Sequence, residues 1–175
     1  MSKVLENIKT RRSIRSFKAD AIPTEILDKI VEAGTYAPTG MNKQSPIILK
    51  ITNKEVRDKL SKINCSAGVW EDGFDPFYGA PVILVVLADK SVPTYVYDGS
   101  LVMQNLMLAA HELGVGSCWI HRAKEEFASE YGQELLKSLG IEGDYEGIGN
   151  CILGYVDGEE PAMKPRKNSW VYSVE

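Results

Sequence analysis

Apolar side chains repeat at helical spacing along much of the chain. In residues 2–10, Val4, Leu5 and Ile8 fall on one side of a predicted helix, and we expect that side to pack inward. Another stripe follows Pro23, and a proline with an early glutamate is typical of a first helical turn. The helices predicted from these stripes cover residues 2–10, about 23–34, 54–63, 101–113 and 123–139, the last broken near Gly132.

Four shorter stretches have the composition of strands. Apart from one proline, residues 81–88 are all valine, isoleucine, leucine or alanine, which is typical of a strand buried on both faces. The helix over 101–113 is apolar almost all round, so we expect it to be central and buried, with Asp98 or Ser100 as its N-cap and a left-handed Gly114 at its end. The other predicted strands cover residues 47–51, 115–120 and 148–156.

Strands separated by helices predict a single α+β domain of three layers, with a central sheet between helices. Residues 64–80 form a long connection rich in glycine and aromatic residues, which is typical of a binding loop or a lid. The tail lacks a helical pattern but alternates Trp170, Tyr172 and Val174. It is therefore either disordered or able to add a strand to a second subunit.

The overall charge and the cysteines exclude several classes of protein. A net charge of −4 argues against a nucleic-acid partner, which needs a basic surface. No apolar run reaches membrane-spanning length, and Lys3 and Glu6 lie where a signal peptide would be apolar, so we expect a cytoplasmic protein without a membrane partner. Cys65, Cys118 and Cys151 are odd in number and far apart, which predicts neither a disulfide framework nor a metal site.

The most distinctive polar stretch is the arginine cluster, which we define as residues 11–15 (Arg-Arg-Ser-Ile-Arg). Its neighbours Ile14 and Phe17 are apolar and should hold it against the domain. Guanidinium groups bind phosphate and carbonyl oxygens through paired hydrogen bonds, so the cluster is a candidate site for a phosphorylated small molecule. The alternative is a solvent-exposed turn that only aids solubility.

Two other patterns suggest chemistry that their context does not support. Residues 114–117 (Gly-Val-Gly-Ser) resemble the start of a dinucleotide-binding fingerprint, but Trp119 occupies the third glycine position and the motif follows a helix. A thiol hydrolase using Cys118 and His121 is disfavoured, because residues three apart on a strand point to opposite faces. We interpret His111, in its apolar helix, as a core residue.

Five motifs stand in the order seen in the FMN-dependent nitroreductase family, and the chain resembles its short members. They are the arginine cluster, residues 37–44 (Ala-Pro-Thr-Gly-Met-Asn-Lys-Gln), residues 114–120 (Gly-Val-Gly-Ser-Cys-Trp-Ile), residues 153–155 (Leu-Gly-Tyr) and residues 164–166 (Lys-Pro-Arg). The resemblance covers nearly the whole chain. The chain departs from the family pattern at two places. One is Gln44-Ser45-Pro46, and the other is His121, where the family often has a small residue. His121 either lines the substrate pocket or faces solvent.

This resemblance implies an α+β, three-layer nitroreductase-like fold, with a central, mostly antiparallel or mixed sheet flanked by helices. Residues 1–160 would form the FMN-binding domain. Residues 161–175 would be an extended C-terminal arm that packs on the partner subunit of a homodimer, with FMN bound at the interface.

The resemblance also implies which residues bind the cofactor. Arg11 and Arg12 would hold the phosphate, with Lys164 and Arg166 returning to it from the arm. Ser13 would contact the ribityl chain or the ring edge. Arg15 would lie near N1 and the C2 carbonyl, where a fixed cation stabilises the charge of the reduced ring. The second subunit would supply Pro38, Thr39, Gly40 and Asn42. Gln44 of the same loop is a further candidate for binding the cofactor, and the segment beneath the ring would be Cys118, Trp119, Ile120 and His121.

The implied activity is an NAD(P)H oxidoreductase of the ping-pong type. Hydride would pass from NADH or NADPH to FMN and on to a small electrophile such as a nitroaromatic or a quinone, without a catalytic side chain. Two alternatives stay open. One is a flavin store or redox sensor with little turnover, and the other is a relative with different flavin chemistry, such as reductive dehalogenation.

Overall fold

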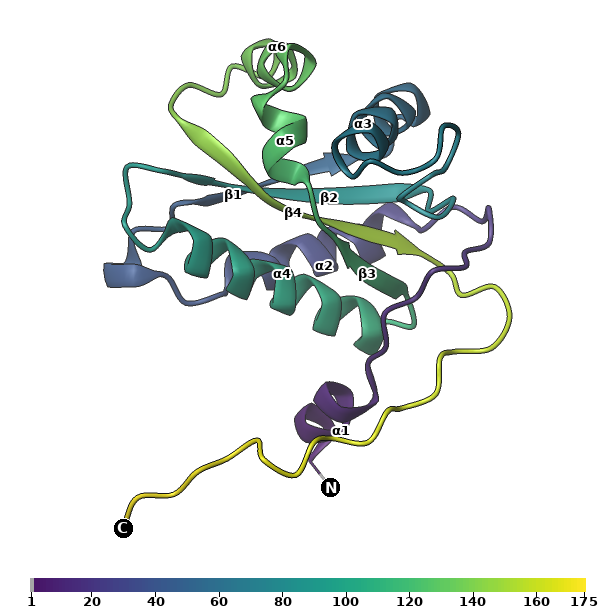
Figure 1. Ribbon diagram of the computed structural model, residues 1–175, viewed down its shortest axis with the longest axis vertical. Coiled ribbons are helices and arrows are strands. Elements are labelled where there is room, and N and C mark those ends of the chain that lie inside the picture. Colours follow the sequence, from purple (N-terminus) through teal and green to yellow (C-terminus); the bar gives the residue numbers. More distant parts are fainter. Residues whose placement is uncertain (1) are drawn as a thin grey trace.

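A computed structural model describes residues 2–175, and its centre is a four-stranded sheet (Figure 1). The strand order is β1-β2-β4-β3, and all three pairings are antiparallel. The strands are β1 (Pro46–Ile51), β2 (Val82–Asp89), β3 (Gly116–Ile120) and β4 (Tyr145–Gly154). The predicted α+β class and the central sheet are confirmed, and the sheet is antiparallel throughout.

Helices cover both faces of this sheet. On one face lie α2 (Thr24–Thr35) and α4 (Tyr95–Glu112), and on the other lie α3 (Lys54–Ala67), α5 (Ala123–Ala128) and α6 (Glu130–Ser138) (Figure 1). Strand β2 separates two apolar cores, because alternate side chains such as Leu84 and Ile83 enter opposite cores with no exposed surface. The prediction of a strand buried on both faces is therefore confirmed.

Several element boundaries differ from the prediction. Helix α4 begins at Tyr95, so Asp98 lies inside its first turn instead of capping it. The break between α5 and α6 is at Ser129, not Gly132. The Ser129 hydroxyl caps α6 by accepting a hydrogen bond from the Gly132 N–H at 3.1 Å. Gly114 follows α4 with a φ of 72°, so the predicted left-handed end is confirmed.

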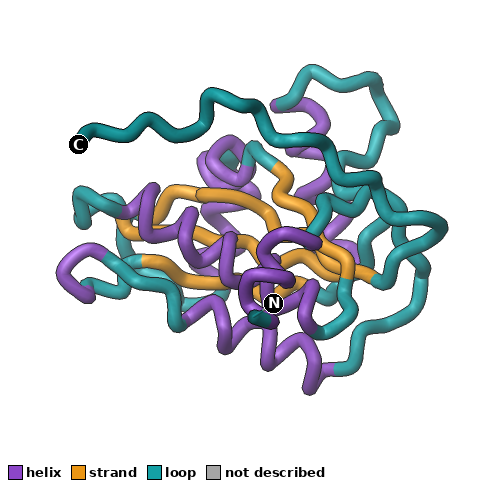
Figure 2. The backbone as a smooth tube through the Cα atoms, turned by 90° about the horizontal axis from the view of Figure 1, so that it is seen from below, coloured by secondary structure: helices purple, strands orange, loops and turns teal. Residues whose placement is uncertain are grey.

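Helix α1 (Lys3–Thr10) and the C-terminal arm project from the domain (Figures 1 and 2). No residue of α1 is buried, and Val4, Leu5 and Ile8 are 65%, 51% and 49% exposed. The expectation that this face packs inward is therefore wrong within one chain. The arm, residues 161–175, is exposed throughout and contains no helix or strand. Among residues 2–175, none of the helices combines the length and apolar character needed to span a membrane.

Candidate functional site

The arginine cluster lies along the edge of the sheet beside β3. The Ile14 N–H donates to the Ser117 carbonyl at 2.9 Å, and further along the Lys18 N–H donates to the Tyr155 carbonyl at 2.9 Å. The Ile14 side chain is 4% exposed, and Phe17 packs against the core. The expectation that apolar neighbours hold the cluster is thus confirmed, and a solvated turn does not describe a segment fixed in this way.

A small cavity of about 110 Å³ opens at the cluster. Its lining includes Arg11, Arg12, His111, Ser117 and Glu160, the residue just before the arm. Within the described part of the chain, Arg11 Nη1 and Ser117 Oγ are buried and have no hydrogen-bond partner. A buried donor without a partner costs about 1–3 kcal/mol, and more when it is charged. Two such atoms beside a cavity fit an anionic oxygen ligand, such as the phosphate of a nucleotide cofactor.

His111 lies at this cavity and is not the core residue that the sequence predicted. The Thr10 hydroxyl donates to the Glu6 carbonyl at 2.8 Å, and it also lies 2.9 Å from His111 Nε2. Since a hydroxyl has one hydrogen and a carbonyl can only accept, the His111 Nε2–H must be the donor to Thr10. This bond fixes the His111 ring against α1 at the edge of the cavity.

The loop over residues 38–44 is held at the first turn of α4. The Asp98 carboxylate, 3% exposed, accepts hydrogen bonds from the Gly40 N–H at 3.0 Å, the Ser45 hydroxyl at 3.1 Å and the Thr94 hydroxyl at 3.0 Å. Pro38, Asn42 and Gln44 are exposed, and Thr39 is partly buried. Sequence reasoning considered Asp98 only as a helix cap and missed that it positions this loop.

The predicted site residues form two groups at opposite ends of α4. The 38–44 loop is fixed at Asp98, whereas the arginine cluster is fixed at His111. Thirteen residues of helix separate these points, which corresponds to about 20 Å at the rise of an α-helix. Arg11, Arg12, Ser13 and Arg15 belong to the second group, together with the adjoining residues 118–121. Lys164 and Arg166 lie on the exposed arm and join neither group within residues 2–175.

The segment 118–121 carries no activated nucleophile. Cys118 is 1% exposed, whereas His121 is exposed, so the two side chains do not meet on one face. Burial raises the pKa of the Cys118 thiol, against the opposing influence of Arg15, Ser13 and Arg11. The thiol is therefore protonated at neutral pH, and the geometry does not support a thiol hydrolase.

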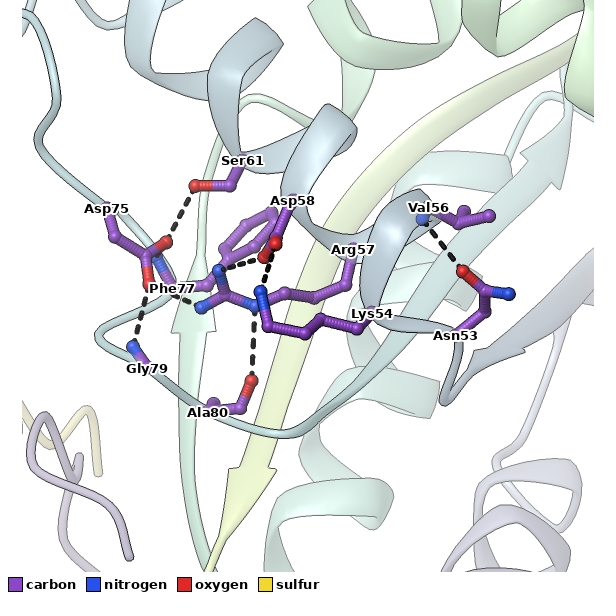
Figure 3. A network of polar contacts seen from close by, with 10 residues as sticks. All are labelled: Asn53, Lys54, Val56, Arg57, Asp58, Ser61, Asp75, Phe77, Gly79 and Ala80. Carbon is purple, nitrogen blue, oxygen red and sulfur yellow. Dashed lines mark hydrogen bonds and ion pairs between the residues drawn. The ribbon is translucent and has the colours of Figure 1, made fainter. Parts of the chain in front are cut away.

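The loop over residues 68–81 is anchored by a carboxylate (Figure 3). Asp75 accepts hydrogen bonds from the Ser61 hydroxyl at 2.6 Å and from the N–H groups of Phe77 at 3.0 Å and Gly79 at 2.7 Å. It also forms an ion pair with Arg57, whose side chain is 10% exposed. The loop begins later than predicted, because α3 extends to residue 67. The contacts of Asp75 hold it against α3.

Aromatic rings of this loop lead toward the arginine cluster. The rings of Trp70 and Phe74 are 5.4 Å apart between centroids, and those of Phe74 and Tyr78 are 5.7 Å apart. The Arg15 guanidinium lies 6.0 Å from the centre of the Tyr78 ring. The prediction of a binding loop over residues 64–80 included these rings, but the long-range contact between Arg15 and Tyr78 has no local signal in the sequence.

Comparison with known proteins identifies the family. The sequence model of the nitroreductase family matches residues 8–68 and 70–157, which is most of the chain. The chain belongs to the nitroreductase family. Its relatives in this family include a protein of Archaeoglobus fulgidus, provisionally named an NADH dehydrogenase/NAD(P)H nitroreductase, at 30% identity over 91% of this chain and 89% of that protein.

Two further members of the family match this chain to different extents. A relative from Methanothermobacter thermautotrophicus with the same provisional name is 34% identical over 66% of this chain, and the alignment spans only 59% of that relative. A crystal structure of a nitroreductase with bound FMN from Bacteroides fragilis matches over 100% of both chains, with a TM-score of 0.89 and 28% identity. The fold described above is thus that of a nitroreductase.

Proposed function

We propose that this chain is an FMN-dependent NAD(P)H oxidoreductase of the nitroreductase type. The observation that carries the proposal is the pair of buried donors without partners, Arg11 Nη1 and Ser117 Oγ, at one small cavity. Family membership supports FMN as the ligand, since a relative of the same fold binds it. In this proposal, the cavity receives the FMN phosphate, with Arg11 and Ser117 as donors and Arg12 beside them.

The remaining cofactor contacts follow the position of each segment. Residues 118–121 lie next to the arginine cluster and would run beneath the flavin ring, with Ser13 at its edge. Arg15 carries a fixed positive charge beside Tyr78, where it would stabilise negative charge on the reduced ring. When bound, FMN supplies the redox chemistry by taking a hydride at N5 and passing electrons on.

The site requires a second copy of the chain. The 38–44 loop lies about 20 Å along α4 from the arginine cluster, so one chain cannot place both groups on one small ligand. In a two-fold dimer, the loop of one subunit can approach the cluster of the other. Exposed apolar residues offer the surface for such a dimer, for example Leu5 at 51% and Ile8 at 49% on α1, and Tyr97 at 71% on α4.

The arm has a docking place on a second subunit. Strand β1 is an open edge of the sheet, and an apolar groove of about 440 Å³ runs beside it, lined by β1, the start of α3 and the end of α6. The alternating Trp170 and Tyr172 of the arm are exposed in the single chain, at 65% and 84%. In this proposal the end of the arm, with Trp170 and Tyr172, docks in that groove of the second subunit, whereas Lys164 and Arg166, earlier on the arm, contribute to a phosphate site.

The electron donor in this proposal is NADH or NADPH, and the acceptor is a small electrophile such as a nitroaromatic or a quinone. The nicotinamide binds, leaves, and the acceptor takes its place, which predicts ping-pong kinetics. The site residues bind and orient the ring, and no side chain has to transfer a proton before the hydride moves. The cytoplasm is the expected compartment, because it holds the pool of reduced nicotinamide nucleotides.

The first experiment is an absorbance spectrum of the purified protein after reconstitution with FMN, followed by anaerobic addition of NADH or NADPH. Flavin bands at roughly 370 and 450 nm that bleach with the nucleotide are the expected result. A protein that takes up no FMN would refute the proposal. Bound flavin that neither nucleotide reduces would favour a flavin store or sensor instead.

A variant pair tests the phosphate assignment. Arg11→Ala should weaken FMN binding by about 10- to 150-fold, because a charge-assisted hydrogen bond is worth about 1.5–3 kcal/mol. Lys137→Ala removes an exposed cation on α6, far from the cavity, and should leave the affinity unchanged. Equal affinities of the two variants would show that the cavity at Arg11 does not bind the phosphate.

A further inference from the structure

A carboxyl group lies buried between three elements behind residues 118–121. Glu126 of α5 has no exposed surface, and its Oε1 accepts hydrogen bonds from Asn64 Nδ2 of α3 at 2.5 Å and from Asn150 Nδ2 of β4 at 2.8 Å. None of the roles assigned above uses this cluster. A buried carboxyl that faces two amides and no cation is costly to ionise.

The atoms left over in this cluster indicate that the carboxyl carries a proton. Within the described residues, Glu126 Oε2 and Asn150 Oδ1 are both buried without a partner. When Glu126 is ionised, both atoms are acceptors and neither can satisfy the other. A proton on Oε2 turns it into a donor that suits Asn150 Oδ1, so that the acid and the amide can share two hydrogen bonds. Burial raises the pKa of Glu126 to about 7, with Glu125 adding to the rise and the bonds from Asn64 and Asn150 opposing it.

The same cluster holds the turn that ends the segment beneath the proposed flavin. The second N–H of the Asn64 amide donates to the His121 carbonyl at 2.7 Å. Arg122, the next residue, has a φ of 80°, a left-handed conformation that non-glycine residues rarely adopt. Asn64 therefore ties a strained turn to Glu126, and the geometry of that turn depends on where the Asn64 amide points.

We propose that Glu126 is a positioning residue: in its protonated form it holds Asn64 on the His121 carbonyl and so keeps residues 118–121 in place for FMN, and on ionisation it releases them. When Glu126 is ionised, its Oε2 is an acceptor without a donor and attracts the amide of Asn64 or Asn150. A shift of the Asn64 amide breaks its bond to the His121 carbonyl. This inference rests on the proposed function. It predicts that FMN affinity falls as the pH rises through neutrality.

Other charged groups near Glu126 act differently. Glu125 forms an ion pair with Arg122 at 2.8 Å and keeps its charge above acidic pH. His121 in the preceding turn is exposed, and His111 lies at the proposed phosphate cavity. From α3 and β4, the groups bonded to Glu126 are the uncharged amides of Asn64 and Asn150. Any pH dependence that comes from the histidines persists when Glu126 alone is replaced.

Glu126→Gln is the decisive variant, because glutamine has the same shape as the protonated acid and can donate to Asn150 Oδ1. The dissociation constant of FMN is measured by quenching of flavin fluorescence from pH 5.5 to 8.5 in both proteins. We expect equal affinities at the acidic end. At the alkaline end, the wild type should bind about 2- to 12-fold more weakly than the variant, which corresponds to one net hydrogen bond. A constant ratio across the range would overturn the proposal.

A second measurement does not need the cofactor or the variant. The infrared C=O stretch of a protonated carboxylic acid should be present in the cofactor-free wild type at pH 6 and should disappear as the pH is raised to 8.5. Its absence at pH 6 would refute protonation of Glu126. If FMN bound at no pH, the proposed function would fail and this inference with it, whereas binding with the same pH dependence in both proteins would overturn only the inference.

Discussion

The anchor of the 68–81 loop gives a prediction with a matched control. Asp75→Ala removes the acceptor for Ser61, Phe77, Gly79 and Arg57 (Figure 3) and leaves the buried Arg57 guanidinium with only the Ala80 carbonyl and Asp58. Breaking a buried ion pair costs about 3–5 kcal/mol. Because the Asp75 side chain is 33% exposed and Asp58 still faces Arg57, we expect the low end, about 3 kcal/mol.

The assay is urea unfolding of the protein without FMN, so that cofactor binding does not add to stability. With a slope of about 2–3 kcal/mol per M urea, a loss of 3 kcal/mol lowers the midpoint by about 1–1.5 M. The control, Asp58→Ala, removes the other carboxylate that faces Arg57, at 3.0 Å. Asp58 is about as exposed as Asp75, but it accepts no hydrogen bond from the loop, and its loss should cost less than about 1 kcal/mol. Equal shifts for the two variants would refute the view that Asp75 anchors the loop.

The pH dependence of stability provides an independent check on Asp75. Burial by itself would raise the pKa of this carboxyl, but the hydrogen bonds from Arg57, Ser61, Gly79 and Phe77 together hold it below the ordinary value of 3.8. A lowered pKa stabilises the folded protein above 3.8, and this contribution is lost as the pH falls below that value. Asp75→Asn should therefore flatten the decline of stability in acid, and an unchanged acid profile would contradict the assignment.

Three further predictions follow from single positions. Gly147→Ala should cost 3 kcal/mol or more in thermal unfolding, because the added methyl would lie 2.1 Å from the Ala123 carbonyl oxygen, an overlap with backbone that side chains cannot relieve. If the proposed dimer forms through α4, Leu101→Asp on the exposed side of this helix should convert it to monomers in sedimentation analysis and weaken FMN binding. Asp98→Ala should cost about 3 kcal/mol in urea unfolding and free the loop at Gly40, which proteolysis would detect.

Local sequence patterns were sufficient to predict the elements whose burial or ending is visible in the composition of a short stretch. The aliphatic run of β2 and the Gly114 end of α4 are examples, since composition alone indicates a doubly buried strand and a left-handed glycine indicates a helix end. The start of α4 was missed because Gly99 weakens the helical pattern. In the folded protein, a side chain at position 99 would lie 2.6 Å from Ile148 of β4. This steric reason for a glycine inside a helix exists only in the folded sheet and cannot be read from the local sequence.

The candidate site was harder to predict than the fold. The stripe on α1 indicates that Leu5 and Ile8 will be covered, but a stripe does not say which chain covers them. The arginine cluster could be recognised because its residues are adjacent. Asp98, His111 and Tyr78 could not, since each reaches the site from a distant part of the chain and its partner is set by packing instead of local spacing.

The length of α4 has a consequence for how chains of this type can vary. The helix has 18 residues, and its two ends hold the two halves of the site. One residue inserted in α4 would lengthen it by about 1.5 Å and turn everything beyond it by about 100°. In the proposed dimer, the 38–44 loop would then miss the cofactor of the second subunit, whereas insertions in the 68–81 loop or the arm leave that spacing intact. Homologues should therefore differ in length at the loop and the arm and agree in length along α4.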